Sequence, residues 1–137
     1  MANNPHFSLA SRHGMLDTLN TAVSSAGILN IYAGVQPADV SSAVTAANVI
    51  LATPSWVTNA FAAAGASAVA ANAITSDASA AGSTSVSAAW FSICKSTGTR
   101  VIDGSVGTAA ADLVLNSVMI STGATVAISA FTVTAAA

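Results

Sequence analysis

The sequence predicts a mainly β protein, built as an antiparallel β-sandwich or a jelly-roll-like fold with an N-terminal arm and one short helix. Short runs rich in branched and aromatic residues recur along the chain, and turn residues separate them at 76–77, 96–98 and 121–123. No second helical pattern alternates with these runs, which argues against parallel βαβ units. With 137 residues, the chain has the size of one domain with one core.

The helix is expected within residues 11–23, where Leu16, Leu19 and Val23 recur at helical spacing. Gly27 is the expected stop, because glycine tolerates the left-handed backbone that often ends a helix. Residues 1–10 have no regular pattern and are interpreted as an irregular arm. We therefore predict an arm with a short helix at 1–27, followed by a β-sandwich domain at 28–137.

The strands are predicted from their composition and from the turns between them. The first covers Ile28–Ala33 and ends in a loop that begins at Gly34. Trp90 and Phe91 are neighbours in one strand, so their side chains project from opposite faces of the sheet. One of them enters the core, and the other is covered either by a loop of this chain or by another subunit. The remaining strands are expected at 48–52, 57–62, 68–74, 85–95, 100–106, 112–120 and 125–133.

Five aspartates are the only acidic residues of the chain, and four of them indicate local structure. Asp103-Gly104 interrupts a strand-like run and predicts a bulge or a tight turn. Asp39, Asp77 and Asp112 lie in loop-like stretches beside Ala, Ser or Thr. There we expect each carboxylate to accept hydrogen bonds from nearby backbone.

The chain carries very little charge: three Lys+Arg and five Asp+Glu make up 6% of its residues, against about 25% in typical soluble domains. Ala, Ser and Thr are cheaper to bury in an interface than Lys or Glu, so this composition favours a protein that packs against neighbours. A weakly charged soluble monomer is the alternative. Arg12, Lys95 and Arg100 are the only basic residues, too few and too scattered for nucleic-acid binding.

Nothing in the sequence indicates a membrane segment or a secretory signal. Residues 1–6 have no basic patch followed by an apolar run, so we expect synthesis in the cytoplasm. The mean hydropathy of +0.70 comes from Ala and Val. No stretch approaches the roughly 18–20 apolar residues that a membrane helix needs.

Few groups have the chemistry that catalysis requires, and no common catalytic motif or phosphate-binding loop is present, so we do not expect an enzyme. Cys94 lies in an apolar run and is expected to be a buried structural thiol. His13 and Asp17 share a helix face, but with only His6 as a further ligand they do not make a metal site. No cofactor or metal is therefore expected.

The order of several short motifs resembles that of small Ala/Ser/Thr/Gly-rich virion proteins encoded among the head genes of tailed bacteriophages. A helix precedes these motifs, and the similarity is clearest from Ile28 to Val133. The motifs are Ile28–Pro37, Asn72–Asp77, Trp90-Phe91 and Val101–Gly107.

The resemblance implies a capsid decoration (cement) protein, which attaches to the outer surface of a phage head and stabilises it. The implied partners are the major capsid protein and further copies of this chain, as a dimer or trimer, and the implied location is the virion surface. No catalytic motif is carried over. The alternatives are a phage tail or fibre subunit, or a receptor- or glycan-binding module, for which Trp56 beside Pro54 is the aromatic candidate.

The arm and helix are expected to reach across onto a neighbour, and exposed aromatic residues are expected to add contacts. The predicted contact residues are Asn3, Pro5, His6, Phe7, Arg12, Leu16, Leu19, Trp56, Trp90 and Phe91.

Overall fold

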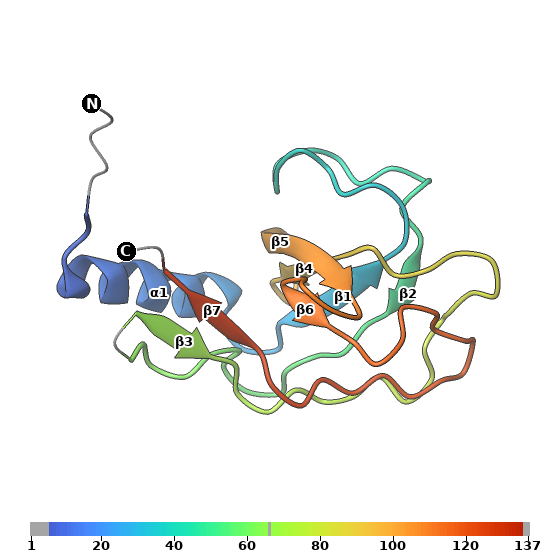
Figure 1. The fold of residues 1–137 in the computed structure, drawn as a ribbon. Helices are drawn as coiled ribbons and strands as arrows, with labels where there is room; N and C mark the ends of the chain where they lie inside the picture. Colours follow the sequence, from blue (N-terminus) through green and yellow to red (C-terminus); the bar gives the residue numbers. More distant parts are fainter. Residues whose placement is uncertain (1–5, 66, 136–137) are drawn as a thin grey trace.

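The computed structural model describes residues 6–65 and 67–135, and it confirms a mainly β protein with one short helix (Figure 1). The described part contains the helix α1 and seven short strands. Their bounds are α1 Leu9–Val23, β1 Ile28–Tyr32, β2 Ile50–Ala52, β3 Ala68–Ala70, β4 Trp90–Cys94, β5 Arg100–Gly107, β6 Leu113–Val114 and β7 Thr132–Thr134.

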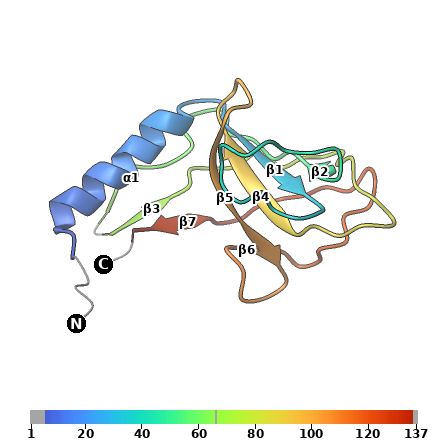
Figure 2. The ribbon, with the colours of Figure 1, turned by 90° about the horizontal axis from the view of Figure 1, so that it is seen from above.

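The strands form two sheets. A five-stranded sheet has the order β2-β1-β4-β5-β6, and a two-stranded sheet joins β3 to β7. The expected antiparallel pairing is found for every pair except β5 and β6, which run parallel, so the larger sheet is mixed. Figure 2 shows the two-stranded sheet beside α1, at one end of the molecule, with the larger sheet at the other.

Helix α1 is confirmed, and it begins two residues earlier than predicted. The side chain of Ser8 caps its first turn by accepting a hydrogen bond from the N–H of Ser11 at 3.1 Å. The predicted stop at Gly27 is wrong, because Ser24 ends the helix with a φ of 61° and donates its N–H to Asn20. Gly27 instead permits close packing, since a Cβ there would lie 2.6 Å from Cγ1 of Val23.

Several predicted strands are shorter than expected. The segment 57–62 is not a strand, although Phe61 forms an isolated bridge to Ala71. The segments 74–89 and 115–131 are also largely irregular: several of their backbone groups bond to each other, as between Asp77 and Val126, but they form isolated contacts rather than a regular ladder. Alternating Ala and Ser matched the strand pattern in composition, but such small side chains contribute little packing energy to hold a strand in register.

The bulge or tight turn predicted at Asp103-Gly104 is not found at these two residues. Strand β5 runs without interruption through both residues, and its irregularity lies where Ile93 and Cys94 pair with Ile102 and Arg100. Gly104 faces the ring of Phe91, and a Cβ at residue 104 would lie 2.6 Å from that ring. Glycine is therefore required here by the close approach of an aromatic ring across the strand pair.

The core lies against one face of the five-stranded sheet. Leu29 and Ile93 pair across β1 and β4, and both are fully buried there. Phe91 packs edge-to-face against Phe131, which precedes β7, with ring centroids 5.4 Å apart. Leu16 of α1 belongs to the same cluster. The helix and both sheets thus contribute to one continuous core, which fixes the face of the larger sheet that points away from it.

Candidate protein interface

The other face of the five-stranded sheet carries polar and aromatic side chains. Asn30, Ser92 and Asp103 lie opposite one another across β1, β4 and β5, and Tyr32 lies opposite Trp90 in the next row. Ser92 is fully buried and Trp90 is 1% exposed, so this face is also covered. The cover is the loop 34–49, which connects β1 to β2.

Trp90 is held on this face by two neighbouring side chains. Its ring stacks on Tyr32 with centroids 4.2 Å apart and an interplanar angle of 9°. The guanidinium carbon of Arg100 lies 5.7 Å from the centroid of the Trp90 ring, within cation–π range. Both Trp90 and Phe91 are 1% exposed, so the chain covers both by itself, and the prediction that these two residues contact a partner is wrong for this structure.

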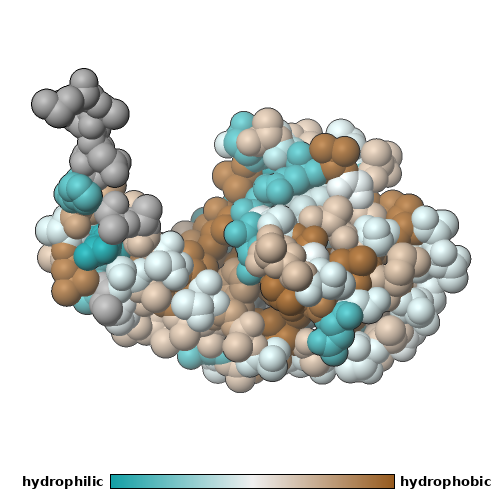
Figure 3. All heavy atoms as spheres, viewed as in Figure 1, coloured by the Kyte–Doolittle hydropathy of each residue, from teal (hydrophilic) through white to brown (hydrophobic). Residues whose placement is uncertain are grey.

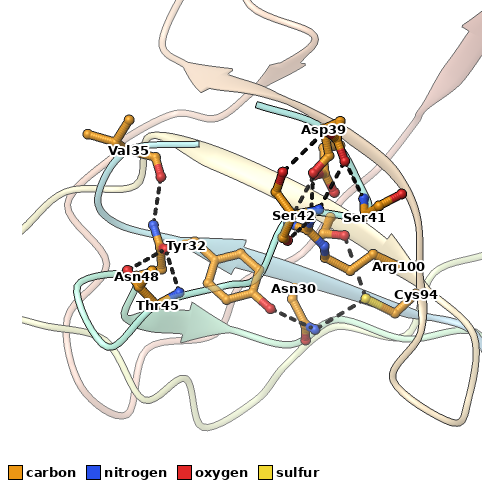
Figure 4. A network of polar contacts seen from close by, with 12 residues as sticks. Asn30, Tyr32, Val35, Asp39, Ser41, Ser42, Thr45, Asn48, Cys94 and Arg100 are labelled. Atoms are coloured by element: carbon orange, nitrogen blue, oxygen red, sulfur yellow. Dashed lines mark hydrogen bonds and ion pairs between the residues drawn. The ribbon is translucent and has the colours of Figure 1, made fainter. Parts of the chain in front are cut away.

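Arg100 connects the sheet to the loop (Figure 4). Its Nη2 donates to the carbonyl oxygens of Asp39 at 2.8 Å and Ser42 at 2.7 Å. Its Nη1 lies 3.1 Å from Oδ2 of Asp103, and these two side chains are 7% and 4% exposed. This contact is an ion pair rather than an aligned hydrogen bond, because neither atom meets hydrogen-bond geometry. One buried cation thus neutralises a buried carboxylate and fixes two loop carbonyls.

The loop also carries its own turn bonds. The Asp39 carboxylate accepts hydrogen bonds from the N–H groups of Ser41 at 2.7 Å and Ser42 at 2.9 Å, which lower its pKa. The side-chain amide of Asn48 donates to the carbonyl of Val35 at 2.7 Å and closes the loop near its base. The predicted bonding of an aspartate to nearby backbone is confirmed here. The loop is therefore fixed both internally and to the sheet.

Similar bonds are found at the other two loop aspartates. Asp77 accepts from the N–H groups of Ser79 and Thr53, and Asp112 accepts from the N–H and hydroxyl of Ser105. These bonds lower the pKa of both carboxyl groups, through the Thr53 N–H first at Asp77 and through the Ser105 N–H first at Asp112. Both aspartates thus hold irregular segments to the strands.

The fixed loop exposes several branched apolar side chains. We name the segment 34–50 the valine loop, because Val35 is 84% exposed and four further branched side chains are 39–43% exposed. In Figure 3 apolar atoms lie among polar ones over this part of the molecule. The sequence analysis missed these residues, and the signal was their recurrence within a segment otherwise rich in turn residues. The four further residues are Val40, Val44, Val49 and Ile50.

The predicted contact residues of the N-terminal region have different environments. Phe7 is 50% exposed and His6 is exposed, whereas Arg12 and Leu19 are partly buried. Leu16 is 4% exposed and packs in the core, so the expectation that it contacts a partner is wrong for this structure. Asn3 and Pro5 lie outside the described residues. The exposed apolar residues of this region that the prediction missed are Leu9 and Met15.

Trp56 is buried, which corrects its prediction as an exposed aromatic. It is 1% exposed, and its indole N–H donates to the carbonyl of Asn72 at 3.2 Å. Its ring lies 6.0 Å from that of Phe61 between centroids. Pro54 and Ser55 precede it in irregular chain, as the sequence indicated, but the tryptophan side chain turns inward and fills the core.

Two titratable groups of the covered face, the Cys94 thiol and the Tyr32 hydroxyl, have a raised pKa. Burial raises the pKa of the Cys94 thiol and, together with the nearby Cys94 charge, the pKa of Tyr32. Asn30 donates its side-chain N–H to the Tyr32 oxygen at 3.3 Å and to the Cys94 sulfur at 3.6 Å. The buried thiol was predicted and is confirmed. These groups act as packing and hydrogen-bonding partners. Among residues 6–65 and 67–135, no three His, Cys, Asp or Glu side chains cluster as metal ligands.

Two hollows open on the C-terminal part of the chain. One, of about 330 Å³, lies between residues 114–120 and 124–130. The other, of about 300 Å³, lies between residues 71–74 and 128–131. Both are lined mainly by small and branched side chains and backbone. Residues 128–130 line both hollows, so this short stretch forms a strip between them.

Comparison with known proteins gives no relative for this chain: no family model, no curated protein and no solved structure matches it. Within the described residues, α1 is too short and too polar to cross a membrane, and no other helix is present. The candidate interface therefore rests on the geometry of the chain alone: a fixed loop that exposes five branched apolar side chains, and exposed apolar residues before and on α1.

Proposed function

We propose that this chain is a structural protein of a phage virion, which binds the outer surface of the capsid and stabilises it as a cement protein. The observation that carries the proposal is the valine loop, which exposes five branched apolar side chains on a backbone fixed by Arg100, Asp39 and Asn48. A loop that is ordered before binding loses little conformational entropy when it docks, so its apolar contacts add affinity efficiently.

Charge and geometry support the same proposal. No charged side chain other than Asp39 lies within residues 34–50, so docking of this surface requires little desolvation of charge. A repeating shell offers the same contact many times, and many modest contacts then act together. The phage class itself comes from the resemblance of the motifs, and the loop supplies the surface through which such a protein would attach.

The start of α1 provides a second contact region. Phe7 and Leu9 are each 50% exposed, and Met15 is 56% exposed. Phe7 precedes the Ser8 cap, while Leu9 and Met15 lie on the helix that follows. We propose that this group and the preceding arm contact a neighbouring subunit of the shell, either the major capsid protein or another copy of this chain. Copies would assemble as a dimer or trimer.

The sandwich fold is part of this proposal. The two sheets contribute side chains to one core, and Phe131 beside β7 contacts both Phe91 of β4 and Phe61, at 5.4 and 6.5 Å between centroids. These contacts support an arrangement of two β layers around shared aromatic residues. A rigid sandwich would hold the valine loop at a constant angle to the shell.

The test is binding of the purified chain to capsids lacking it, together with electron cryo-microscopy of the particles. We expect density at repeated positions on the head, and we expect Val35→Ser with Val44→Ser to weaken binding about tenfold or more, since each removes exposed apolar contact area. Val57→Ser with Val86→Ser is the matched control, because these valines are 76% and 38% exposed outside the loop.

Three results would contradict the proposal in different ways. Density confined to the tail would replace it with the tail or fibre subunit. Absence from the particle would remove the virion role altogether. Equal binding by the loop variant and the control variant would show that the valine loop is not the contact surface. The sequence-based argument for a receptor- or glycan-binding module depended on an exposed Trp56, and Trp56 is buried.

A further inference from the structure

Strand β7 has one bonded edge and one open edge. On one side β7 pairs with β3, and the backbone bonds continue beyond both strand ends. The N–H of Ala71 donates to the carbonyl of Phe131 at 2.8 Å, and the N–H of Ala135 donates to the carbonyl of Ser67 at 2.9 Å. Backbone groups alternate in direction along a strand, so those of Thr132 and Thr134 point to the other side. That side is the edge of the two-stranded sheet, because β7 has β3 as its one neighbour among the described strands.

No hydrogen bond joins this outer edge to another part of the described chain. Strand β7 pairs only with β3, and neither the backbone nor the side-chain bonds of the described residues include Thr132 or Thr134 as partners on the outer side. Both threonines are exposed, while Val133 between them is partly buried. The unpaired N–H and C=O groups of an exposed edge are a template for another strand.

Apart from its short length of three residues, β7 lacks the features by which proteins usually block such pairing. Lysine, inward-pointing charge and proline are the common devices, and residues 113–137 contain none of them. The last charged residue before the end of the sequence is Asp112. Two identical edges of this kind therefore approach each other without charge repulsion and without loss of a solvated ion.

We propose that the outer edge of β7 pairs antiparallel with the same strand of a second copy of this chain. A two-fold axis at Val133 places Thr132 of one copy opposite Thr134 of the other, and those are the residues whose backbone groups point outward. The pairing is self-complementary, as a two-fold interface requires, and it sets threonines across from threonines. The two small sheets then form one four-stranded sheet with the order β3-β7-β7-β3.

This inference rests on the proposed function only in placing the dimer within a repeating assembly. The strand pairing itself is expected for the purified chain in solution. It also names the surface through which copies join, separately from the valine loop that would face the shell. Strand β7 is short, so the isolated dimer is expected to be weak and visible as a rise in mass with concentration.

The test is sedimentation equilibrium of the purified full chain, with amide hydrogen exchange at low and high concentration. The expected mass rises from 13.3 kDa toward twice that value, and the Thr132 and Thr134 amides exchange more slowly as it rises. Thr132→Pro removes one outward N–H from each copy and leaves the bonds to β3 intact, so we expect at least about tenfold weaker dimerisation. Thr132→Val keeps the N–H and is the matched control.

A chain that stays monomeric up to roughly millimolar concentration would overturn the proposal, because even a pairing of millimolar affinity is then detectable. So would a dimer in which the two threonine amides exchange as fast as in dilute solution. If Thr132→Pro does not fold, hydrogen exchange on the unaltered chain decides alone. A monomer that binds capsids would contradict the pairing and support the proposed function. A dimer through β7 that binds no capsid would support the pairing and contradict the proposed function.

Discussion

One face of the five-stranded sheet is covered by apolar side chains, and the other is covered by a loop that forms hydrogen bonds to it. On the first face Leu29 and Ile93 are fully buried, and on the second Ser92 is equally buried and Cys94 is 1% exposed. Apolar packing has no direction, so many arrangements of neighbours stabilise the first face. On the polar face Arg100 donates directed hydrogen bonds to two loop carbonyls, and bonds of this kind favour one arrangement of the loop.

The two faces therefore contribute differently to the folded domain, one to its stability and the other to the geometry of the exposed loop. The apolar face supplies most of the folding free energy, because burial of large side chains is the dominant favourable contribution. The polar face supplies the geometry of the valine loop through Arg100 and its two carbonyl partners. Substitutions on the two faces should therefore affect global stability and loop order to different extents.

The largest effect is expected on the apolar face. Phe91→Ala removes a fully packed ring that contacts Phe131 and Gly104, and we expect it to lower the free energy of unfolding by about 3–5 kcal/mol. Urea denaturation with an unchanged m-value would measure this loss. Val57→Ala is the control, since its side chain is 76% exposed and its substitution should cost under about 0.5 kcal/mol. A loss below about 1 kcal/mol for Phe91→Ala would contradict the packing described for this face.

Arg100→Lys tests the polar face. Arginine uses Nη2 for the two loop carbonyls and Nη1 for Asp103, whereas lysine has one nitrogen for all three, so we expect a loss of about 1–3 kcal/mol. The diagnostic measurement is amide hydrogen exchange, which should accelerate selectively within residues 39–48. Phe91→Ala should accelerate exchange throughout the core instead. If Arg100→Lys changes no loop amide more than the core amides, the loop is not held by this arginine. Lys95→Met in the turn before β5 is the charge-altering control.

The sequence was sufficient for those elements whose signal is local. The helix at 9–23 and the strands β1, β4 and β5 were predicted, because periodicity and branched residues mark them within a few residues. The cover of Trp90 was left open between a loop and a partner, because the deciding contacts join Arg100 to carbonyls 58 and 61 residues away. Backbone carbonyls carry no sequence signature, so no pattern identifies them in advance.

Trp56 and the valine loop show that sequence patterns do not reveal whether an apolar side chain in irregular chain is buried or exposed. A tryptophan after Pro54 in irregular chain was expected at the surface, yet its N–H finds the Asn72 carbonyl and its ring enters the core. The valines of the loop were not singled out, because branched residues usually indicate burial. Whether an apolar residue in a loop points inward depends on distant partners. The contact surface therefore had to come from the structure.

Acid should weaken the polar face before the apolar face. Hydrogen bonds lower the folded-state pKa of Asp39 and of Asp112, which accepts from Ser105 opposite Trp90. A carboxyl group with a lowered folded pKa contributes stability above its unfolded pKa of about 3.8–3.9, and that contribution is lost as pH falls through the folded value. We expect the urea midpoint to be constant from pH 7 to about 5 and to decrease below pH 4.

Asp112→Ala is the variant that isolates this effect. It should lower stability at pH 6 and reduce the additional loss between pH 6 and pH 3, because one of the titrating groups is gone. Ser117→Ala, which alters a hydroxyl outside the strands, is the control and should keep the full pH dependence. An identical pH profile for the wild type and Asp112→Ala would show that the Ser105 bonds contribute nothing to acid sensitivity.

The smallest effect on stability is expected at Cys94, where substitution nonetheless reports directly on the covered face. Cys94→Ser keeps the size of the side chain and its hydrogen bonding to Asn30 and Ser92, so we expect a loss of roughly 1 kcal/mol or less. In the wild type, burial raises the pKa of the thiol, so thiol reagents at pH 8 should modify the folded chain far more slowly than the unfolded chain. Arg100→Lys should increase that rate severalfold, because loosening of the loop uncovers the row to which Cys94 belongs. Phe91→Ala should increase the rate of thiol modification only in proportion to the unfolded population. If both variants increase the rate only in that proportion, the two faces do not open independently.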